Sequence, residues 1–221
     1  MLVAHLAAAA LALACPSSLA NDLRDQPASA RQLITVDAAS MRTTHATLRT
    51  WRRAGACWVR AGGPYRARLG WNGLSASRRE GDGTTPAGTF RIHATMYGNE
   101  PNPGVRFRYV RVRCGVWWDE DASSPTYNSF QRIGCGRKPP FGVKSEGMWE
   151  SPGAYPYLAV IEFNMRPVVS GRGSGIFLHA TTKGSTNGCV SIARDELRRV
   201  LRWLRPNANP WVAIGTRATL T

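Results

Sequence analysis

Acidic residues are scarce in this chain of 221 residues, and the shortage of negative charge is the first constraint on its partners. Fourteen Asp and Glu stand against 29 Lys and Arg, which gives a formal net charge of +15 at pH 7. A strongly basic chain favours an anionic partner. No nucleic-acid-binding module is recognisable and the basic residues are not concentrated, so nucleic acid is not expected. An anionic cell envelope fits better, and ordinary solvated surface explains many of these residues equally well.

One short run of basic residues alternates along a predicted strand. Arg106, Arg108, Arg111 and Arg113 fall at largely alternating positions, so one face of that strand is expected to be basic. The sequence does not assign this face a role.

The chain lacks an apolar run long enough to cross a bilayer. Residues 2–13 are apolar and alanine-rich, which is typical of the central part of a secretory signal peptide. Ser18 and Ala20 place small residues at the two positions that a signal peptidase reads, so we predict a signal peptide over residues 1–20. Lipid anchoring at Cys15 is less favoured, because leucine does not stand three residues before it. We therefore expect an exported protein, in the periplasm or the extracellular cell wall, without a transmembrane segment.

Only five cysteines are present, and export decides how they are interpreted, because disulfides persist outside the cytoplasm. Removal of residues 1–20 leaves Cys57, Cys114, Cys135 and Cys189, which allow three full pairings. If Cys189 stays free, Cys114 and Cys135 bracket a loop-like region and are the best pair. Cys57 then lies in an apolar strand as a core residue.

Histidine is scarcer still, with four in the chain. His5, His45 and His93 lie in unrelated contexts. His179 and Cys189 lack a second pair of ligands at zinc-finger spacing, so no metal site is expected.

Long regular segments are also lacking, and many short strand-like runs separated by glycine and proline predict a mostly β domain. One helix is predicted over residues 193–204, where leucine and valine recur at helical spacing. Residues 21–31 are expected to form a flexible N-terminal tail, residues 32–221 the domain, and residues 99–156 long loops over one face of a sheet. Strands are expected over residues 32–36, 45–53, 56–60, 65–69, 88–94, 105–112, 157–163, 175–179 and 211–215.

The segment 175–191 carries the candidate chemistry. A β-rich apolar run ends in His179, and ten residues later Cys189 follows Gly188, which permits a sharp turn. A histidine beside a cysteine supplies a base and a thiol nucleophile. A helix that starts soon after Cys189 would favour the thiolate at its N-terminus, although the acidic first turn of that helix tempers the effect. A lone cysteine is more often a buried apolar residue or half of a disulfide, so the pair alone does not establish catalysis.

A second motif favours catalysis over a purely structural cysteine. Residues 81–90, Gly-Asp-Gly-Thr-Thr-Pro-Ala-Gly-Thr-Phe, form a turn-rich segment that leads into a strand. Together with His179 and Cys189 it resembles the L,D-transpeptidase family, the YkuD-type catalytic domain of bacterial cell-wall enzymes. That family carries a Gly-x-x-Thr-Pro-x-Gly turn before a strand, then a histidine, then a Gly-Cys nucleophile element. The resemblance extends from Leu33 to Thr216.

The resemblance implies a role for four residues near the thiol. Cys189 corresponds to the acylated nucleophile and His179 to its general base. The backbone carbonyl of Ala180 would orient the histidine ring, and Gly188 with the amides around Cys189 would form the oxyanion hole.

Three positions depart from the family pattern. Thr186 and Asn187 stand where Ser-His is common, and Ser191 stands where an arginine often follows the cysteine by two. The interval from histidine to cysteine is also shorter than usual. These three residues are expected to contact substrate, and Asn187 is able to donate a hydrogen bond in place of the missing histidine.

The resemblance also implies a fold and a reaction. The fold is a mixed β-sandwich of α+β character, with a C-terminal helix following the nucleophile, in a monomer. The reaction is acyl transfer on peptidoglycan stem peptides through a thioester, which gives 3–3 cross-links when an amine resolves it and needs neither metal nor organic cofactor. Two alternatives stay open: an L,D-carboxypeptidase that uses water, and a non-catalytic cell-wall-binding module.

Overall fold

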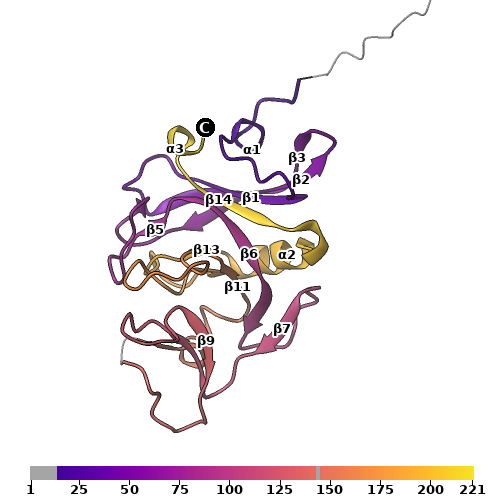
Figure 1. Cartoon of the computed structure of the whole chain (residues 1–221). Helices are drawn as coiled ribbons and strands as arrows, with labels where there is room; N and C mark the ends of the chain where they lie inside the picture. The colour runs from indigo at the N-terminus through magenta and orange to yellow at the C-terminus, as the bar shows by residue number, and fades with distance from the viewer. Residues whose placement is uncertain (1–13, 143–144) are drawn as a thin grey trace, which may run out of the picture.

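The computed structural model describes residues 14–142 and 145–221, and a nine-stranded mixed sheet is its main element. The strand order is β11-β12-β13-β3-β2-β1-β14-β6-β7, and β11 also pairs with β6. All strands of this order except β7 therefore close into a ring, which Figure 1 shows as two facing layers. The strands are β1 (Gln32–Asp37), β2 (His45–Ala54), β3 (Cys57–Arg68), β6 (Gly88–Gly98), β7 (Arg108–Arg111), β11 (Leu158–Ile161), β12 (Phe177–Ala180), β13 (Val190–Ile192) and β14 (Trp211–Gly215).

Smaller elements surround this ring. The region expected to be loops contains a three-stranded sheet of order β10-β8-β9, and a two-stranded sheet joins β4 to β5. Their bounds, with those of the helices, are β4 (Leu74–Ser75), β5 (Thr85–Pro86), β8 (Val116–Asp119), β9 (Ser129–Arg132), β10 (Glu146–Gly147), α1 (Leu19–Asp22), η1 (Met148–Glu150), α2 (Arg194–Trp203), η2 (Pro206–Ala208) and α3 (Arg217–Leu220).

The expected mostly β fold, with a C-terminal helix after the segment that contains Cys189, is confirmed. Two of the expected strands are in fact one, since residues 57–60 and 65–68 both belong to strand β3. Its Gly62-Gly63-Pro64 sequence does not end the strand, because the register against β2 shifts between Leu48 and Trp51 and absorbs the irregularity. The strand pairing therefore continues through a sequence that is typical of a turn.

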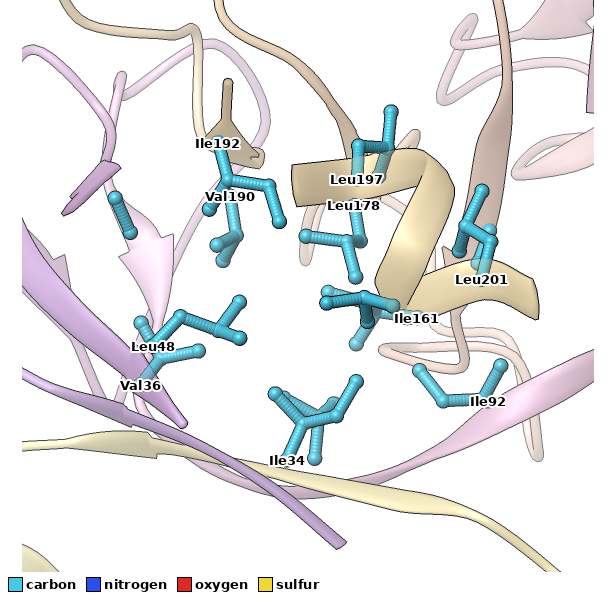
Figure 2. Packing of buried hydrophobic residues seen from close by; sticks show 14 of the residues in the cluster. Ile34, Val36, Leu48, Ile92, Ile161, Leu178, Val190, Ile192, Leu197 and Leu201 are labelled. Carbon is cyan, nitrogen blue, oxygen red and sulfur yellow. The ribbon is translucent and has the colours of Figure 1, made fainter. Parts of the chain in front are cut away.

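The main hydrophobic core fills the inside of the ring and is closed by α2. Figure 2 shows Leu197 and Leu201 projecting from α2 toward Leu178 and Ile161. All four side chains are buried. Because β12 supplies both Leu178 to the core and the histidine that follows it, this packing fixes the backbone at the candidate site.

Two disulfides lie outside this core. Cys114 is joined to Cys135, the pair expected from the sequence, and Cys15 is joined to Cys57. The expectation that Cys57 is an unpaired core residue is wrong. It begins β3 just after the β2–β3 turn, where the N-terminal segment crosses it and supplies a partner.

The N-terminal region is packed onto the domain over its described part. Leu23 and Ala30, in the segment expected to be a flexible tail, are buried beside β1 and β3. Residues 1–13 of the expected signal peptide lie outside the described residues. Within residues 14–142 and 145–221, no helix is long and apolar enough to cross a membrane.

Candidate active site

Parallel strands β12 and β13 bring the predicted histidine and cysteine to one groove. His179 of β12 lies opposite Ser191 of β13, and Cys189 immediately precedes β13. Side chains two residues apart on a strand point to the same face, so Cys189 and Ser191 share the face that His179 occupies on the neighbouring strand. Cys189 and His179 both line a groove of about 1030 Å³.

The Cys189 thiol is free and buried, with 7% of the residue exposed. Its Sγ donates to the Gly175 carbonyl at 3.2 Å and accepts from the Phe177 backbone N–H at 3.3 Å. Burial raises the pKa of this thiol to about 12, so it rests as a neutral thiol. No hydrogen bond between Cys189 and His179 is found in the described part of the chain, so the pair rests unlinked.

The helix N-terminus expected near the thiol is elsewhere. Strand β13 follows Cys189 at once, and α2 begins only at Arg194. Val190 and Ile192 are β-branched and fully buried, and β13 pairs with both β12 and β3. The residues after Cys189 therefore form a strand instead of the start of a helix. Direct stabilisation of a thiolate by the first turn of α2 is therefore not part of this site.

His179 is buried and held in one tautomer. Its Nδ1 lies 2.9 Å from the Ala180 carbonyl oxygen, which only accepts, so Nδ1 carries the proton and Nε2 keeps a free lone pair. Burial lowers the pKa of this imidazole to about 4, so it is neutral at pH 7. The Tyr155 ring packs edge-on against it at a centroid distance of 5.3 Å. The ring is therefore an oriented neutral base.

Thr186 stabilises the turn before Cys189 through two hydrogen bonds. The Gly188 N–H donates to Thr186 Oγ1 at 3.1 Å, and the same hydroxyl donates to the Cys189 carbonyl at 2.7 Å. The Gly188 amide is thus occupied in this conformation and is not free to bind an oxyanion. Asn187 is exposed and lines the groove, whereas Ser191 is buried and its Oγ accepts from Thr181 Oγ1 at 3.1 Å.

The two motifs behind the family resemblance meet beside the cysteine. Thr85 Oγ1 donates to the Cys189 carbonyl at 3.4 Å. Arg78, just ahead of the glycine-rich turn, contacts the Thr84 carbonyl and lies 3.5 Å from the Asn187 carbonyl through Nη1. The 81–90 motif therefore supports the wall of the nucleophile turn.

Arg78 is a groove residue that the sequence reasoning missed. Only 4% of its side chain is exposed, and its Nη1 lies 3.5 Å from Asp82 Oδ1. Its buried Nε has no hydrogen-bond partner among the described residues. Its position three residues before Gly81 of the Gly81-Asp82-Gly83 turn is the signal that the sequence offers.

Carboxylates on the same groove were also missed, among them Glu80, Glu120 and Glu146. Burial, followed by repulsion from Glu146 and Glu80, raises the pKa of Glu120 to about 8. Glu146 accepts from Tyr155 Oη at 2.9 Å, and Glu80 accepts from Ser174 Oγ at 2.6 Å. Glu120 and Glu146 lie in the poorly patterned region 99–156, which offered no signal for them.

The groove is thus acidic along one wall and carries one buried guanidinium, in a protein of net charge +15. Within residues 14–142 and 145–221, no group of His, Cys, Asp and Glu is arranged to hold a metal ion. The arrangement places a thiol, a neutral imidazole and charged groups of both signs along one surface.

Comparison with known proteins gives a family match. The model of the L,D-transpeptidase catalytic domain, YkuD, matches residues 31–217. No curated protein matches the chain. Among solved structures, the chain is similar to a variant of the helical cell shape determining protein Pgp2 from Campylobacter jejuni. The TM-score is 0.43 at 12% identity, over 85% of this chain and 47% of that one. The chain therefore spans about half the length of that protein.

Proposed function

The chain belongs to the L,D-transpeptidase catalytic-domain family, and from this premise we propose that it forms 3–3 cross-links between peptidoglycan stem peptides with Cys189 as nucleophile. One observation carries the proposal. A free buried thiol and a neutral imidazole, fixed in a single tautomer by Ala180, face the same groove from adjacent parallel strands.

The first half-reaction transfers an acyl group to sulfur. Sγ leaves the Gly175 carbonyl and attacks the carbonyl carbon of the stem residue, while its proton passes to His179 Nε2. Because the resting thiol and imidazole are both neutral, this proton transfer accompanies bond formation rather than preceding it. The tetrahedral intermediate collapses, the terminal D-residue leaves as an amine that takes the Nε2 proton, and a thioester remains on Cys189.

The second half-reaction returns the thiol. An amine of a neighbouring stem attacks the thioester carbon, and His179 Nε2 takes the amine proton. The carbon–sulfur bond then breaks, and the proton moves from Nε2 to Sγ. Oxyanion donors come from backbone amides around Cys189, and the Gly188 amide joins them once it releases Thr186.

The charges of the groove support a substrate that carries both an ammonium and a carboxylate. Glu80 and Glu146 form a wall that favours an ammonium group, such as the side-chain amine of a stem diamino acid. Glu120, whose pKa of about 8 leaves it protonated at pH 7, offers that group a carbonyl acceptor beside them. Arg78 supplies a cation for a carboxylate, since its Nε has no hydrogen-bond partner within residues 14–142 and 145–221. Exposed Asn187 and the neighbouring Thr186 line the same groove, and we propose both, with Ser191, as substrate contacts.

The decisive experiment is intact-mass measurement after incubation with a stem tetrapeptide. The expected result is a thioester adduct on the wild type with loss of the terminal D-residue, and no adduct on Cys189→Ala. Ser185→Ala, on the rim of the groove, is the matched control, because it is also a substitution by alanine but leaves Cys189 in place. An adduct that persists on Cys189→Ala, or no adduct on correctly folded wild type, would refute a cysteine acyltransferase.

The same experiment separates the alternatives. With an amine acceptor present, a transpeptidase yields a cross-linked product, whereas an L,D-carboxypeptidase yields only the shortened stem. A non-catalytic wall-binding module gives no adduct, and its wall binding is unchanged in Cys189→Ala. The oriented base and the free thiol favour either enzyme over a binding module, because binding alone requires neither group.

We further propose that the protein acts outside the cytoplasm, as a monomer at the anionic envelope. Two disulfides among the described residues support an oxidising compartment. Fractionation of the producing cell should place the protein with the envelope or medium, and recovery with cytoplasmic markers would contradict this.

A further inference from the structure

We propose that the leader is removed between Ala14 and Cys15, not after Ala20, so that Cys15 begins the working protein and is held by a disulfide to Cys57. This inference rests on the export part of the proposed function and not on its catalytic part. An experiment that refutes this cleavage site therefore does not refute the catalytic role of Cys189, and the reverse also holds. Three features support cleavage at this bond: the packing of residues 14–23, the number of cysteines, and the small residues around each candidate bond.

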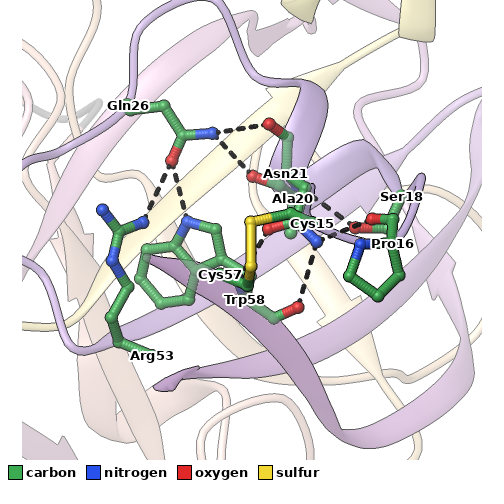
Figure 3. The surroundings of a disulfide bond; sticks show 9 residues. All are labelled: Cys15, Pro16, Ser18, Ala20, Asn21, Gln26, Arg53, Cys57 and Trp58. Carbon is green, nitrogen blue, oxygen red and sulfur yellow. Dashed lines mark hydrogen bonds between the residues drawn. A yellow bond between two sulfur atoms is a disulfide. The ribbon is translucent and has the colours of Figure 1, made fainter. Parts of the chain in front are cut away.

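The segment after Cys15 is bonded to strand β3, as Figure 3 shows. Cys15 is joined to Cys57, 42 residues away. Asn21 Nδ2 donates to the Pro16 carbonyl at 2.8 Å and to the Trp58 carbonyl at 3.1 Å. Its Oδ1 accepts from the Trp58 backbone N–H at 2.6 Å. Residues on both sides of the Ala20–Asn21 bond are therefore part of one hydrogen-bonded unit with β3.

The same segment supplies apolar side chains to a core cluster. Ala20 is 0% exposed, and Leu19 and Leu23 are buried with it against Trp58 and Leu220. The Ala20–Asn21 bond lies inside helix α1, which Ser18 caps. Cleavage there would remove the first half of α1 and uncover Trp58. Ala14, by contrast, is exposed, and cleavage after it keeps Cys15 and all of α1.

The number of cysteines leads to the same bond. A chain starting at Asn21 keeps four cysteines with Cys114 paired to Cys135, which leaves Cys57 as an unpaired thiol in an oxidising compartment. A chain starting at Cys15 keeps all five. Thiol oxidants of that compartment then accept two electrons and two protons as Cys15 and Cys57 join, and Cys189 stays the free nucleophile.

The sequence around both bonds satisfies the requirement for small residues. Ala12 and Ala14 stand three and one residues before the first bond, as Ser18 and Ala20 do before the second. Sequence therefore permits either cleavage, and the structure selects the first. The disulfide also excludes a lipid anchor on Cys15, because a thioether to lipid and a disulfide use the same sulfur atom.

The test is the intact mass of the protein after export of the full chain, purified without reductant. The expected mass is that of residues 15–221 with two disulfides. A mass starting at Asn21, a lipid-modified Cys15, or an exported chain that keeps its leader would each overturn the inference.

Two matched variants show which bond the peptidase reads. Ala14→Asp puts a charge directly before the proposed bond and is expected to abolish normal processing. Ser18→Asp puts the same charge three residues before the alternative bond and keeps a helix-capping side chain, so it should be processed like wild type. Normal processing of Ala14→Asp, with loss of processing in Ser18→Asp, would reverse the assignment.

Alkylation of the unreduced, denatured protein gives an independent readout. One thiol, Cys189, is expected to react, and digestion without reductant should yield a Cys15–Cys57 linked peptide. Two reactive thiols, at Cys57 and Cys189, would show that Cys15 had been removed or left unpaired and would refute the proposal. Cys57→Ser is the control, because it should add one reactive thiol at Cys15.

Discussion

Gly188 is the residue on which the geometry of the turn before Cys189 depends. Its φ of +136° is a conformation that side chains rarely adopt, and a Cβ there would collide with Arg78 Nη1. Arg78 can pass beside the cysteine only because this position has no side chain. The turn and the buried guanidinium therefore depend on each other.

Gly188→Ala should lower the rate of Cys189 acylation by about 100-fold, because a small displacement of a reacting group has costs of that order. The measurement is the rate of adduct formation by mass spectrometry. Gly184→Ala is the matched control, since Gly184 also has a positive φ but has open space around it. Equal losses in both variants would show that backbone strain alone, and not the contact with Arg78, is responsible.

His179 gives the site a pH dependence that can be measured as stability. Its pKa is about 4 in the folded protein against about 6.5 when unfolded, because burial disfavours the charged ring. The neutral His179 ring therefore makes its full contribution to the free energy of unfolding above about pH 6.5. This contribution is lost as pH falls from 6.5 to 4, because in that range the unfolded chain binds a proton and the folded chain does not. The loss amounts to about 3 kcal/mol by linkage.

The measurement is the free energy of unfolding of wild type and His179→Gln across this pH range. The difference between the two isolates the histidine from the carboxylates that titrate nearby. Parallel pH profiles would show that the ring is not buried as a neutral base.

The sequence singled out the two residues that we propose as nucleophile and base, but it missed most of the groove that they line. Cys189 and His179 stand next to sharp local signals, a glycine and the end of an apolar run. Glu120 and Glu146 become groove residues only because the region 99–156 folds over the sheet, and no local pattern encodes that long-range contact. The loss of the expected helix dipole at Cys189 has the same origin, since β13 forms through pairing with distant β3.

At the scale of elements, the apolar face of α2 packs into the core beneath β12, the strand that carries His179. Leu201→Ala should lower the free energy of unfolding by about 3 kcal/mol, because it leaves a cavity in the core under β12. Arg199→Ala, exposed on the same helix, should change it by less than about 0.5 kcal/mol. Denaturant unfolding measures both, and similar effects would contradict the packing of α2 into the ring.

Elements with strong local patterns were predicted closely. Strand β14 has the predicted bounds, and α2 lies within the predicted helix, because alternation and helical spacing are local properties of the sequence. The continuity of β3 was missed, because it depends on a register shift against β2 that no local pattern in the sequence indicates. The role of Cys57 was missed because its partner, Cys15, was assigned to the leader.

At the scale of the molecule, two electrostatic environments coexist. The surface is strongly basic, whereas one wall of the groove is acidic and largely shielded from solvent. Exposed charges are screened by salt over about 10 Å at 0.1 M, and buried charges are screened much less. Attraction to an anionic wall and recognition within the groove should therefore respond differently to salt.

Binding to isolated cell walls should fall several-fold between about 0.05 M and 0.5 M salt, as the screening length shortens. Acylation of Cys189 by a small soluble stem peptide should change less than about twofold, because the groove charges are partly buried.

Replacing exposed Arg106, Arg108 and Arg113 together by Gln should weaken wall binding. Replacing Arg52, Arg60 and Arg66 on β2 and β3 should weaken it to a similar extent, since the whole charge attracts the wall. Co-sedimentation measures binding, and retention that is independent of salt and of both replacements would exclude charge as its cause.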